Sequence, residues 1–471
     1  MLNNLTNFFS ILAGKRYKST PEDNDLVALG TKDEKYRGNY KPTATRLVDL
    51  KAYFGGGGGA WDLLRTAVID SETGDDATGT VGDGNLPFRT VAAAKTAGAT
   101  NFYLLPGEYT ETITLASEET YYAAQGVVFT AGGLRSPATN LDNCKWLGSA
   151  NFIGNFEALY LIEENVITDF VFEFDTIRTT NTAGREMYIW VDRTTESTVT
   201  ITGNEVYSYG GNANCIGTLG RVSGTINIKR KLSGFYSLWS SFGAGTLTLN
   251  CPNMVLLDGG WAGNVGSYKQ LFVSYASSGY ENITINGNFY SEVASSLTSI
   301  AGVIMNHTGS APKKITFNGS AKADQLLYGV SAGVAGGTIT INGDMYLPQG
   351  RLLSQTGAGS QVAFEDGNST VSLSSSLGIG VSCFVKNYDI LMTADAHIFR
   401  LTDVTSQLVT NNVNAEGIGV SPSSYFISTS GAPFQAGLKD TWSTQINDPG
   451  FVNAYASGFT NEPLLKVNPI V

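Results

Sequence analysis

The chain has 471 residues, enough for several ordinary domains or for one long repetitive domain. Charged residues make up only 15%, glycine occurs 55 times and hydrophobic residues reach 42%, a composition that excludes wholesale disorder and favours many short strands joined by tight turns. The net charge of −11 argues against binding to the phosphate backbone of nucleic acids.

Other bulk features narrow the class of protein further. No apolar run approaches the roughly 20 residues of a membrane span. In the N-terminal stretch MLNNLTNFFSILAGKRYKS the basic residues follow the apolar residues, which favours a protein made in the cytoplasm over one with a secretion signal. Cys144, Cys215, Cys251 and Cys383 are far apart, so we expect isolated buried thiols, with no metal site and no cofactor.

The first segment covers residues 1–54. Apolar residues recur at helical spacing near its start, a short strand is predicted over 25–30, a loop with two tyrosines follows, and 45–54 has a helical pattern. A segment this short does not bury a core alone, so we interpret it as a peptide that docks on another protein, the alternative being a floppy tail. The predicted docking residues are Leu5, Phe8, Leu12, Leu26, Leu29, Tyr36 and Tyr40.

A hinge and a cap are predicted next. The glycine run at 55–59, including Gly55, Gly57 and Gly59, holds no regular element and marks a flexible domain boundary. Residues 60–131 are predicted to cap the following repeat, with Pro87 in the first turn of a helix that runs through Ala97 and ends at Gly98. Strands are expected within 101–109, 111–116 and 125–133.

Residues 132–410 repeat a short alternating strand that is often followed by Asn-Gly, as in TITINGD at 338–344. Asn-Gly is also a hairpin signal, but a hairpin protein would bring its strands back every 8–12 residues. The motifs recur about every 29 residues, which favours a right-handed parallel β-helix, a solenoid of stacked coils. The second apolar residues of the motifs are Val199, Ile226, Leu247, Ile283, Ile315, Ile339 and Val371.

Within each coil, alternation assigns a direction to every side chain. Ile339 and Ile341 should point inward onto their counterparts, while Thr338 and Thr340 face outward. The Asn-Gly that follows should turn the corner, because both residues tolerate left-handed backbone angles. Residues 411–471 lose the repeat and are predicted to cap the far end of the stack. The fold class is therefore all-β, preceded by a small, partly helical anchor.

Two stretches of sequence resemble known families. GDGNLPFRTVAAAKTAG at 82–98 resembles the N-terminal cap of pectin-lyase-like right-handed β-helix proteins, and DPGFVNAYASGFT at 448–460 is similar to a closing phrase of those chains. DNDLVALGTKDEKYRGNYKPTATRLVDL at 23–50 resembles the start of virion proteins in tailed bacteriophages, including crAss-like phages. The resemblance implies a head or tail fibre or tailspike, a homotrimer whose N-terminus is anchored to other virion proteins.

Residues that could carry chemistry are few. Glycoside hydrolysis needs two carboxylates, and Asp258, Glu365 and Asp366 are the weak catalytic candidates, each more typical of a turn or a surface. Trp239, Trp261 and Tyr268 are carbohydrate-binding candidates within a region rich in aromatic residues, because flat rings stack on sugar faces; internal packing or a trimer seam is the alternative. The basic run Lys229–Lys231 is interpreted as a solvated outer strand.

The favoured function is therefore a structural and adhesive fibre in the virion that presents a β-helical surface to a host-surface polysaccharide. The alternative is a polysaccharide depolymerase, a glycoside hydrolase or lyase, on the same scaffold. A secreted bacterial β-helix enzyme is a third reading, disfavoured by the N-terminus. The protein would be made in the cytoplasm of the bacterial host, without nucleic acid as a partner.

Overall fold

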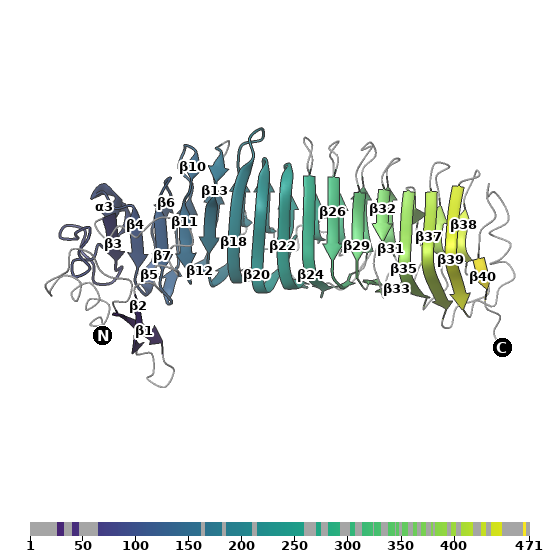
Figure 1. The fold of residues 1–471 in the computed structure, drawn as a ribbon, viewed down its shortest axis with the longest axis horizontal. Coiled ribbons are helices and arrows are strands. Elements are labelled where there is room, and N and C mark those ends of the chain that lie inside the picture. The colour runs from purple at the N-terminus through teal and green to yellow at the C-terminus, as the bar shows by residue number, and fades with distance from the viewer. Residues whose placement is uncertain are drawn as a thin grey trace.

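The computed structural model describes residues 26–32, 40–46, 65–161, 165–180, 185–209, 214–258, 270–274, 281–292, 302–306, 313–323, 325–330, 338–343, 345–347, 351–356, 361–364, 369–373, 378–379, 382–392, 397–401, 407–417, 425–429, 435–444 and 465–467. Beyond residue 323 the structure describes the backbone of these strands and the side chain of Asn342. Strands dominate these residues and lie side by side along the long axis, in chain order (Figure 1).

The largest sheet has 23 strands, and every pairing in it is parallel. Its strands are β3 (Thr66–Ile69), β4 (Asn101–Leu104), β5 (Gly107–Tyr109), β7 (Thr120–Ala123), β8 (Val127–Phe129), β11 (Lys145–Gly148), β12 (Asn151–Gly154), β15 (Phe170–Glu173), β16 (Thr176–Thr179), β18 (Ser197–Ser208), β20 (Val222–Gly234), β22 (Gly245–Leu256), β24 (Glu281–Ser291), β26 (Lys313–Asn318), β27 (Ala321–Lys322), β29 (Thr338–Asn342), β30 (Met345–Leu347), β32 (Gln361–Phe364), β33 (Ser369–Leu373), β35 (Ser382–Met392), β37 (Gln407–Gly417), β39 (Gln435–Thr444) and β40 (Leu465–Val467).

A second parallel sheet has ten strands, and three small sheets complete the described structure. The ten strands are β6 (Thr112–Thr114), β9 (Gly133–Arg135), β13 (Leu159–Leu161), β17 (Arg185–Trp190), β19 (Asn214–Leu219), β21 (Trp239–Ser241), β23 (Gln270–Ser274), β25 (Gly302–Asn306), β28 (Gln325–Val330) and β31 (Arg351–Thr356). The small sheets pair β34 (Gly378–Ile379), β36 (His397–Leu401) and β38 (Tyr425–Thr429); β10 (Leu141–Asp142) and β14 (Ile167–Thr168); and β1 (Leu26–Lys32) and β2 (Tyr40–Arg46).

The chain visits three rows of strands in turn. β7, β8 and β9 are followed by β11, β12 and β13 and then by β15, β16 and β17, and each strand pairs with its counterpart one round earlier. The first two rows belong to the large sheet, and the ten-stranded sheet is the third. From β18 to β24 each long strand contributes to both the first and the second row. This all-parallel, recurrent arrangement is compatible with a β-helix.

The predicted stacking of equivalent residues is confirmed for four motifs. Leu247, Ile283, Ile315 and Ile339 pair in succession on β22, β24, β26 and β29. The first three are buried, and Thr284, which alternates with them, is partly exposed. These strands therefore turn one apolar edge inward, as the period-two pattern predicts.

Two of the aligned positions were wrong. Gly224, and not Ile226, pairs with both Val199 and Leu247, so Ile226 lies two residues away from the predicted column. A shift by two residues leaves every side chain on its predicted face, so alternation alone does not detect it. Val371 lies in the second row, where it pairs with Met345, because β33 follows a corner rather than precedes one.

The hairpin interpretation of the Asn-Gly pairs is wrong, because the strands that carry them pair in parallel. At the corner, Asn342 ends β29 and Gly343 follows with φ 125°, a backbone angle that favours glycine. Asn342 donates a hydrogen bond from its side chain to the Asn318 side-chain oxygen at 2.7 Å.

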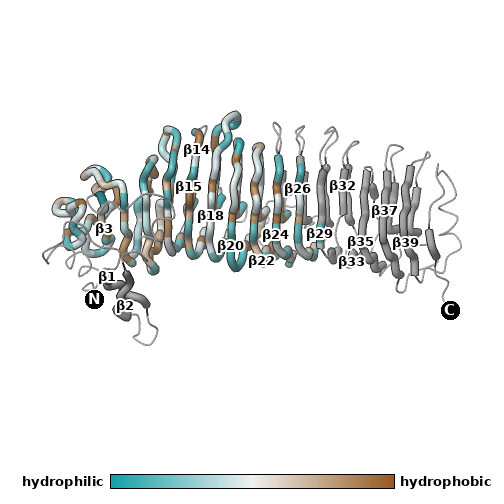
Figure 2. Tube along the Cα trace, viewed as in Figure 1, coloured by the Kyte–Doolittle hydropathy of each residue, from teal (hydrophilic) through white to brown (hydrophobic). Residues whose placement is uncertain are grey.

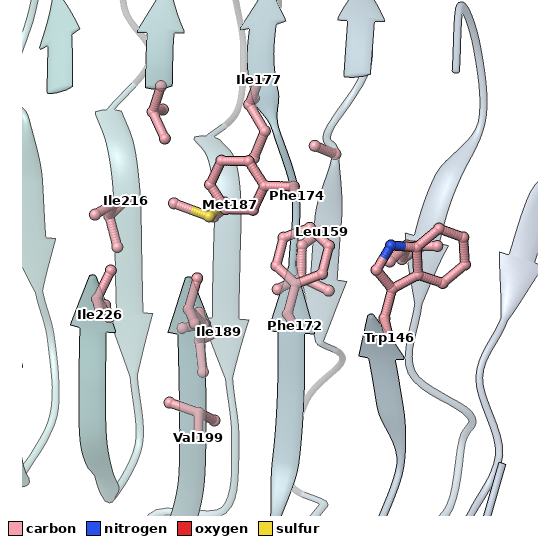
Figure 3. Packing of buried hydrophobic residues seen from close by; sticks show 14 of the residues in the cluster. Trp146, Leu159, Phe172, Phe174, Ile177, Met187, Ile189, Val199, Ile216 and Ile226 are labelled. Carbon is pink, nitrogen blue, oxygen red and sulfur yellow. The ribbon is translucent and has the colours of Figure 1, made fainter. Parts of the chain in front are cut away.

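Apolar side chains from the two large sheets form one continuous core. Figure 3 shows Phe172 and Val199 of the large sheet together with Leu159 and Met187 of the ten-stranded sheet, and all four belong to the same buried cluster. Hydrophobic residues recur from strand to strand along the described stack (Figure 2). Each round of the chain therefore buries its apolar side chains against its neighbours, which gives the core its length.

The predicted cap contains a helix, but a shorter one. α3 spans Val91–Thr96, and Thr90 caps it by accepting a hydrogen bond from the Ala93 amide at 3.2 Å. Pro87 precedes the helix instead of lying in its first turn, because Thr90 supplies the N-cap. Gly98 has φ 91°, as expected of a helix stop. The predicted strands of this region are present, from β4 to β8.

The N-terminal segment is described only in part. The predicted strand at 25–30 is confirmed as β1, which pairs with β2 in antiparallel register. β2 extends to Arg46, so the start of the helix predicted over 45–54 is a strand. Residues 47–54 and the glycine run at 55–59 lie outside the described residues. No helix in the described residues has the length and apolar character needed to cross a membrane.

Candidate functional site: an exposed face of tyrosines and cations

The second row presents a column of six residues in register on successive strands from β16 to β27, of which five are at least partly exposed and Ser233 is buried. Their register partners run Arg178, Tyr207, Ser233, Val255, Tyr290 and Lys322. The column begins and ends with a cation and has a tyrosine next to each end. At about 4.8 Å per strand it spans roughly 24 Å along the stack.

Alternation explains why the five exposed side chains of the column face outward. Each follows directly on a buried apolar residue of the core: Tyr207 follows Val206, and Tyr290 follows Phe289. Tyr290 is 43% exposed, and Tyr209, two residues beyond Tyr207 on the same face, is 47% exposed. Large aromatic side chains this exposed are not part of the core, and they make this face a candidate binding surface.

Positive charge is concentrated on the same strand segments. Glu205 lies between two arginines, 3.5 Å from the Arg178 guanidinium and 3.3 Å from that of Arg230. The Arg178 and Arg230 side chains are 51% and 72% exposed, so one carboxylate leaves an excess of accessible positive charge. We call the following set the tyrosine face: Arg178, Glu205, Tyr207, Tyr209, Lys229, Arg230, Lys231, Tyr290 and Lys322.

Tyr207, near the end of β18, and Tyr209, just after that strand, form an aromatic pair. The ring centroids of Tyr207 and Tyr209 are 4.1 Å apart, with the rings tilted by 32°. Partial burial raises the pKa of the Tyr207 phenol, and the neighbouring Tyr209 phenol and the Glu292 carboxylate raise it further. The phenol thus stays neutral at physiological pH and can donate a hydrogen bond.

The far end of the face pairs an aromatic ring with a cation. The Lys322 ammonium lies 5.1 Å from the centroid of the Tyr290 ring, a cation–π distance. This contact holds the Tyr290 ring beside a positive charge that is itself exposed. An anionic group and a flat sugar ring could therefore be contacted at adjacent points.

The predicted carbohydrate contact Trp239 lies elsewhere. Its side chain is fully buried, packs edge-on against Phe272 at 4.9 Å and donates from Nε1 to Thr218 Oγ1 at 3.2 Å. Trp239 is therefore a core residue whose ring offers no face to a sugar. The other two candidates, Trp261 and Tyr268, lie outside the described residues.

The predicted catalytic carboxylates are not brought together in the described residues. Asp258 is exposed and follows β22 by two residues. Glu365 and Asp366 lie between β32 and β33, outside the described residues. Of the predicted docking residues, Leu26 and Leu29 lie in β1 and Tyr40 begins β2; Leu5, Phe8, Leu12 and Tyr36 lie outside them, as do Gly55, Gly57 and Gly59.

Sequence reasoning noted Tyr207, Tyr209 and the basic run at 229–231 but missed Tyr290 and Lys322. A positional signal was present: Tyr290 and Lys322 each come four residues after the asparagine of an Asn-Gly pair. The interpretation of the basic run as an outer strand is supported by the exposure of Lys229 and Arg230 on β20. Alignment by corner, rather than by strand, would have found the column.

A separate polar cluster lies inside the stack. Glu186 on β17 is fully buried and accepts a hydrogen bond from Ser208 Oγ at 2.6 Å. Burial, together with a smaller effect of the nearby Glu157 carboxylate, raises the pKa of Glu186 to about 8. Glu186 is thus predominantly a neutral acid at pH 7. Cys215 lies nearby and, like Cys144 and Cys251, it is buried and forms no disulfide.

Neither known proteins nor metal-binding side chains indicate a function for the described residues. No protein-family model, curated protein or solved structure matches the chain. In the part of the chain that the structure describes, no group of three or more His, Cys, Asp or Glu side chains could hold a metal ion. The tyrosine face is therefore the candidate functional site on its own geometry.

Proposed function

We propose that this chain is a structural and adhesive component of a tailed-phage particle, a head or tail fibre or a tailspike, which presents a right-handed parallel β-helical shaft to glycans of the host surface. Residues 1–54 would anchor it to other virion proteins through the glycine run at 55–59, and three copies would form the working fibre. The three rows of parallel strands support the shaft, and the resemblance of residues 23–50 supports the anchor.

The tyrosine face is the observation that carries the adhesive role. Its exposed rings and charged groups extend across six successive strands, so a polymer lying along the stack could contact several of them at once. Many weak contacts at a fixed spacing give an avidity that no single contact supplies. A fibre needs this kind of surface to hold a repetitive glycan.

The proposal is tested by measuring binding of the full chain to purified host capsular polysaccharide. Wild-type protein should bind, the double variant Tyr209→Ala, Tyr290→Ala should lose most of the binding, and Tyr122→Ala outside the face should retain it. Absence of binding by the wild type would defeat the adhesive role. Release of reducing ends or unsaturated sugars in the same mixture would favour the depolymerase with Asp258, Glu365 or Asp366.

The virion role needs its own experiment. A labelled copy of the chain should be visible on phage particles by electron microscopy, at a position that distinguishes head from tail. Deletion of residues 1–54 should abolish its incorporation. A truncated chain that still enters particles at normal copy number would contradict the anchor.

A further inference from the structure

We infer that the ligand of the tyrosine face is an acidic polysaccharide, a glycan whose repeating unit carries a negative group. This inference rests on the proposed glycan-binding function and adds the chemical class of the glycan. The face combines flat phenol rings with fixed positive charges, and an acidic sugar polymer offers both complements, ring faces and anions, in every repeat.

The charge of the face is opposite to that of the whole protein. Five cations lie on its strand segments against one carboxylate, Glu205, whereas the full chain has a net charge of −11. Glu292 and Asp258 follow at the ends of β24 and β22. A cationic surface on an acidic protein directs a polyanion to one place, since the rest of the molecule repels it.

The neighbouring row provides a contrast on the same sheet. Its outward column carries threonines in the corresponding strands, paired in register from β18 to β26: Thr200, Thr225, Thr248, Thr284 and Thr316. This column is uncharged and has no aromatic ring. The cations and tyrosines of the second row are therefore not shared by the adjacent first row.

The positive groups are placed to reach a ligand. The exposed guanidinium of Arg178 and the exposed ammonium of Lys322 stand at opposite ends of the column, and Arg230 lies between them on β20. Tyr207 and Tyr290 stand one strand inside each end. A polymer along the column would meet a cation and a ring near each end, with the basic residues of β20 between them.

The binding test uses the full-length protein with polygalacturonate and hyaluronate as probes, each compared with its carboxyl-reduced neutral form. Wild-type protein should bind the acidic polymers at least about tenfold more tightly than the neutral forms, and salt should weaken only the acidic binding. Equal affinity for acidic and neutral forms would overturn the inference, as would binding of neither acidic polymer.

Variants assign the effect to the face. Lys229→Gln, Arg230→Gln, Lys322→Gln combined should weaken acidic binding about tenfold and leave neutral binding unchanged, because exposed ion pairs are each weak and only their sum is large. Lys314→Gln, an exposed lysine on the threonine-bearing row, is the matched control. Glu205→Gln should strengthen acidic binding. A triple variant that binds like Lys314→Gln would contradict the inference.

The outcomes separate this inference from the proposed function. If neutral and acidic polymers bind equally and Tyr209→Ala, Tyr290→Ala abolishes both, glycan adhesion stands and the acidic class falls. If host polysaccharide does not bind at all, the adhesive function itself falls. Single-stranded DNA that binds as tightly as hyaluronate would mean a site for any polyanion, and would also overturn the inference.

Discussion

The side-chain amide of Asn318 donates a 2.7 Å hydrogen bond to the side-chain oxygen of Asn286 on the adjacent strand. The same bond recurs at 2.7 Å along the corner from β20 to β29, so five asparagines form a ladder in which each inner member both donates and accepts: Asn227, Asn250, Asn286, Asn318 and Asn342. The ladder satisfies the amides at a half-buried corner and holds the strands in register.

The ladder predicts that replacing an inner asparagine lowers stability more than replacing one at an end of the ladder. Asn286→Ala removes one bond donated to Asn250 and one accepted from Asn318, and it should lower the free energy of unfolding by about 1–3 kcal/mol. Asn227→Ala at the end removes a single accepted bond and should cost about half as much. Denaturant unfolding followed by circular dichroism measures both. Equal losses would mean that the ladder does not act as a chain of bonds.

Gly319 predicts a larger loss. It has φ 151°, and a Cβ placed there would lie 2.0 Å from the Gly287 carbonyl oxygen on the neighbouring strand. Gly319→Ala should cost at least about 3 kcal/mol, because backbone strain and a clash with backbone add together. Gly98→Ala is the control, since its φ is 91° but no atom lies within 4 Å of the added carbon. Thermal unfolding should show the smaller shift for Gly98.

Glu186 predicts a pH dependence of stability. Its folded pKa of about 8 lies above the ordinary 4.5, so the folded protein keeps a proton that the unfolded chain releases. Stability should therefore fall as pH rises from about 4.5 to 8, by up to about 1.4 kcal/mol per pH unit, and be level above. Glu186→Gln should flatten this slope, and Glu72→Gln at an exposed position should not. Unfolding at several pH values measures it.

Trp239 and Tyr290 predict opposite results in stability and binding. Trp239→Ala should lower stability by about 3–5 kcal/mol, because it leaves a cavity beside Phe272. Tyr290→Ala should cost less than about 1 kcal/mol and reduce glycan binding. Trp239→Phe keeps most of the packing, so it should fold and bind normally. A loss of binding in a folded Trp239→Phe protein would contradict the core assignment.

The sequence was sufficient to predict a strand-rich fold with parallel pairing, because strand motifs with a period of two recur about every 29 residues. Leu247, Ile283 and Ile315 are equivalent in sequence and are paired in the structure. Exact register was not predictable at Ile226, since shifting by two residues changes no side-chain direction. The binding face was harder to predict because its members come from strands that are distant in sequence. Tyr207 and Tyr290 become neighbours on one column only through the corners between them.

The matching columns make one circuit of chain an interchangeable unit. Leu247, Ile283 and Ile315 occupy equivalent places, so removing residues 283–314 would set Leu247 directly against Ile315 with every inward side chain still inward. The shortened protein would keep a continuous core and a continuous asparagine ladder. Of the tyrosine face it would lose only Tyr290. Duplication or loss of whole circuits is thus a route by which the length of this protein can change without redesign of its interior.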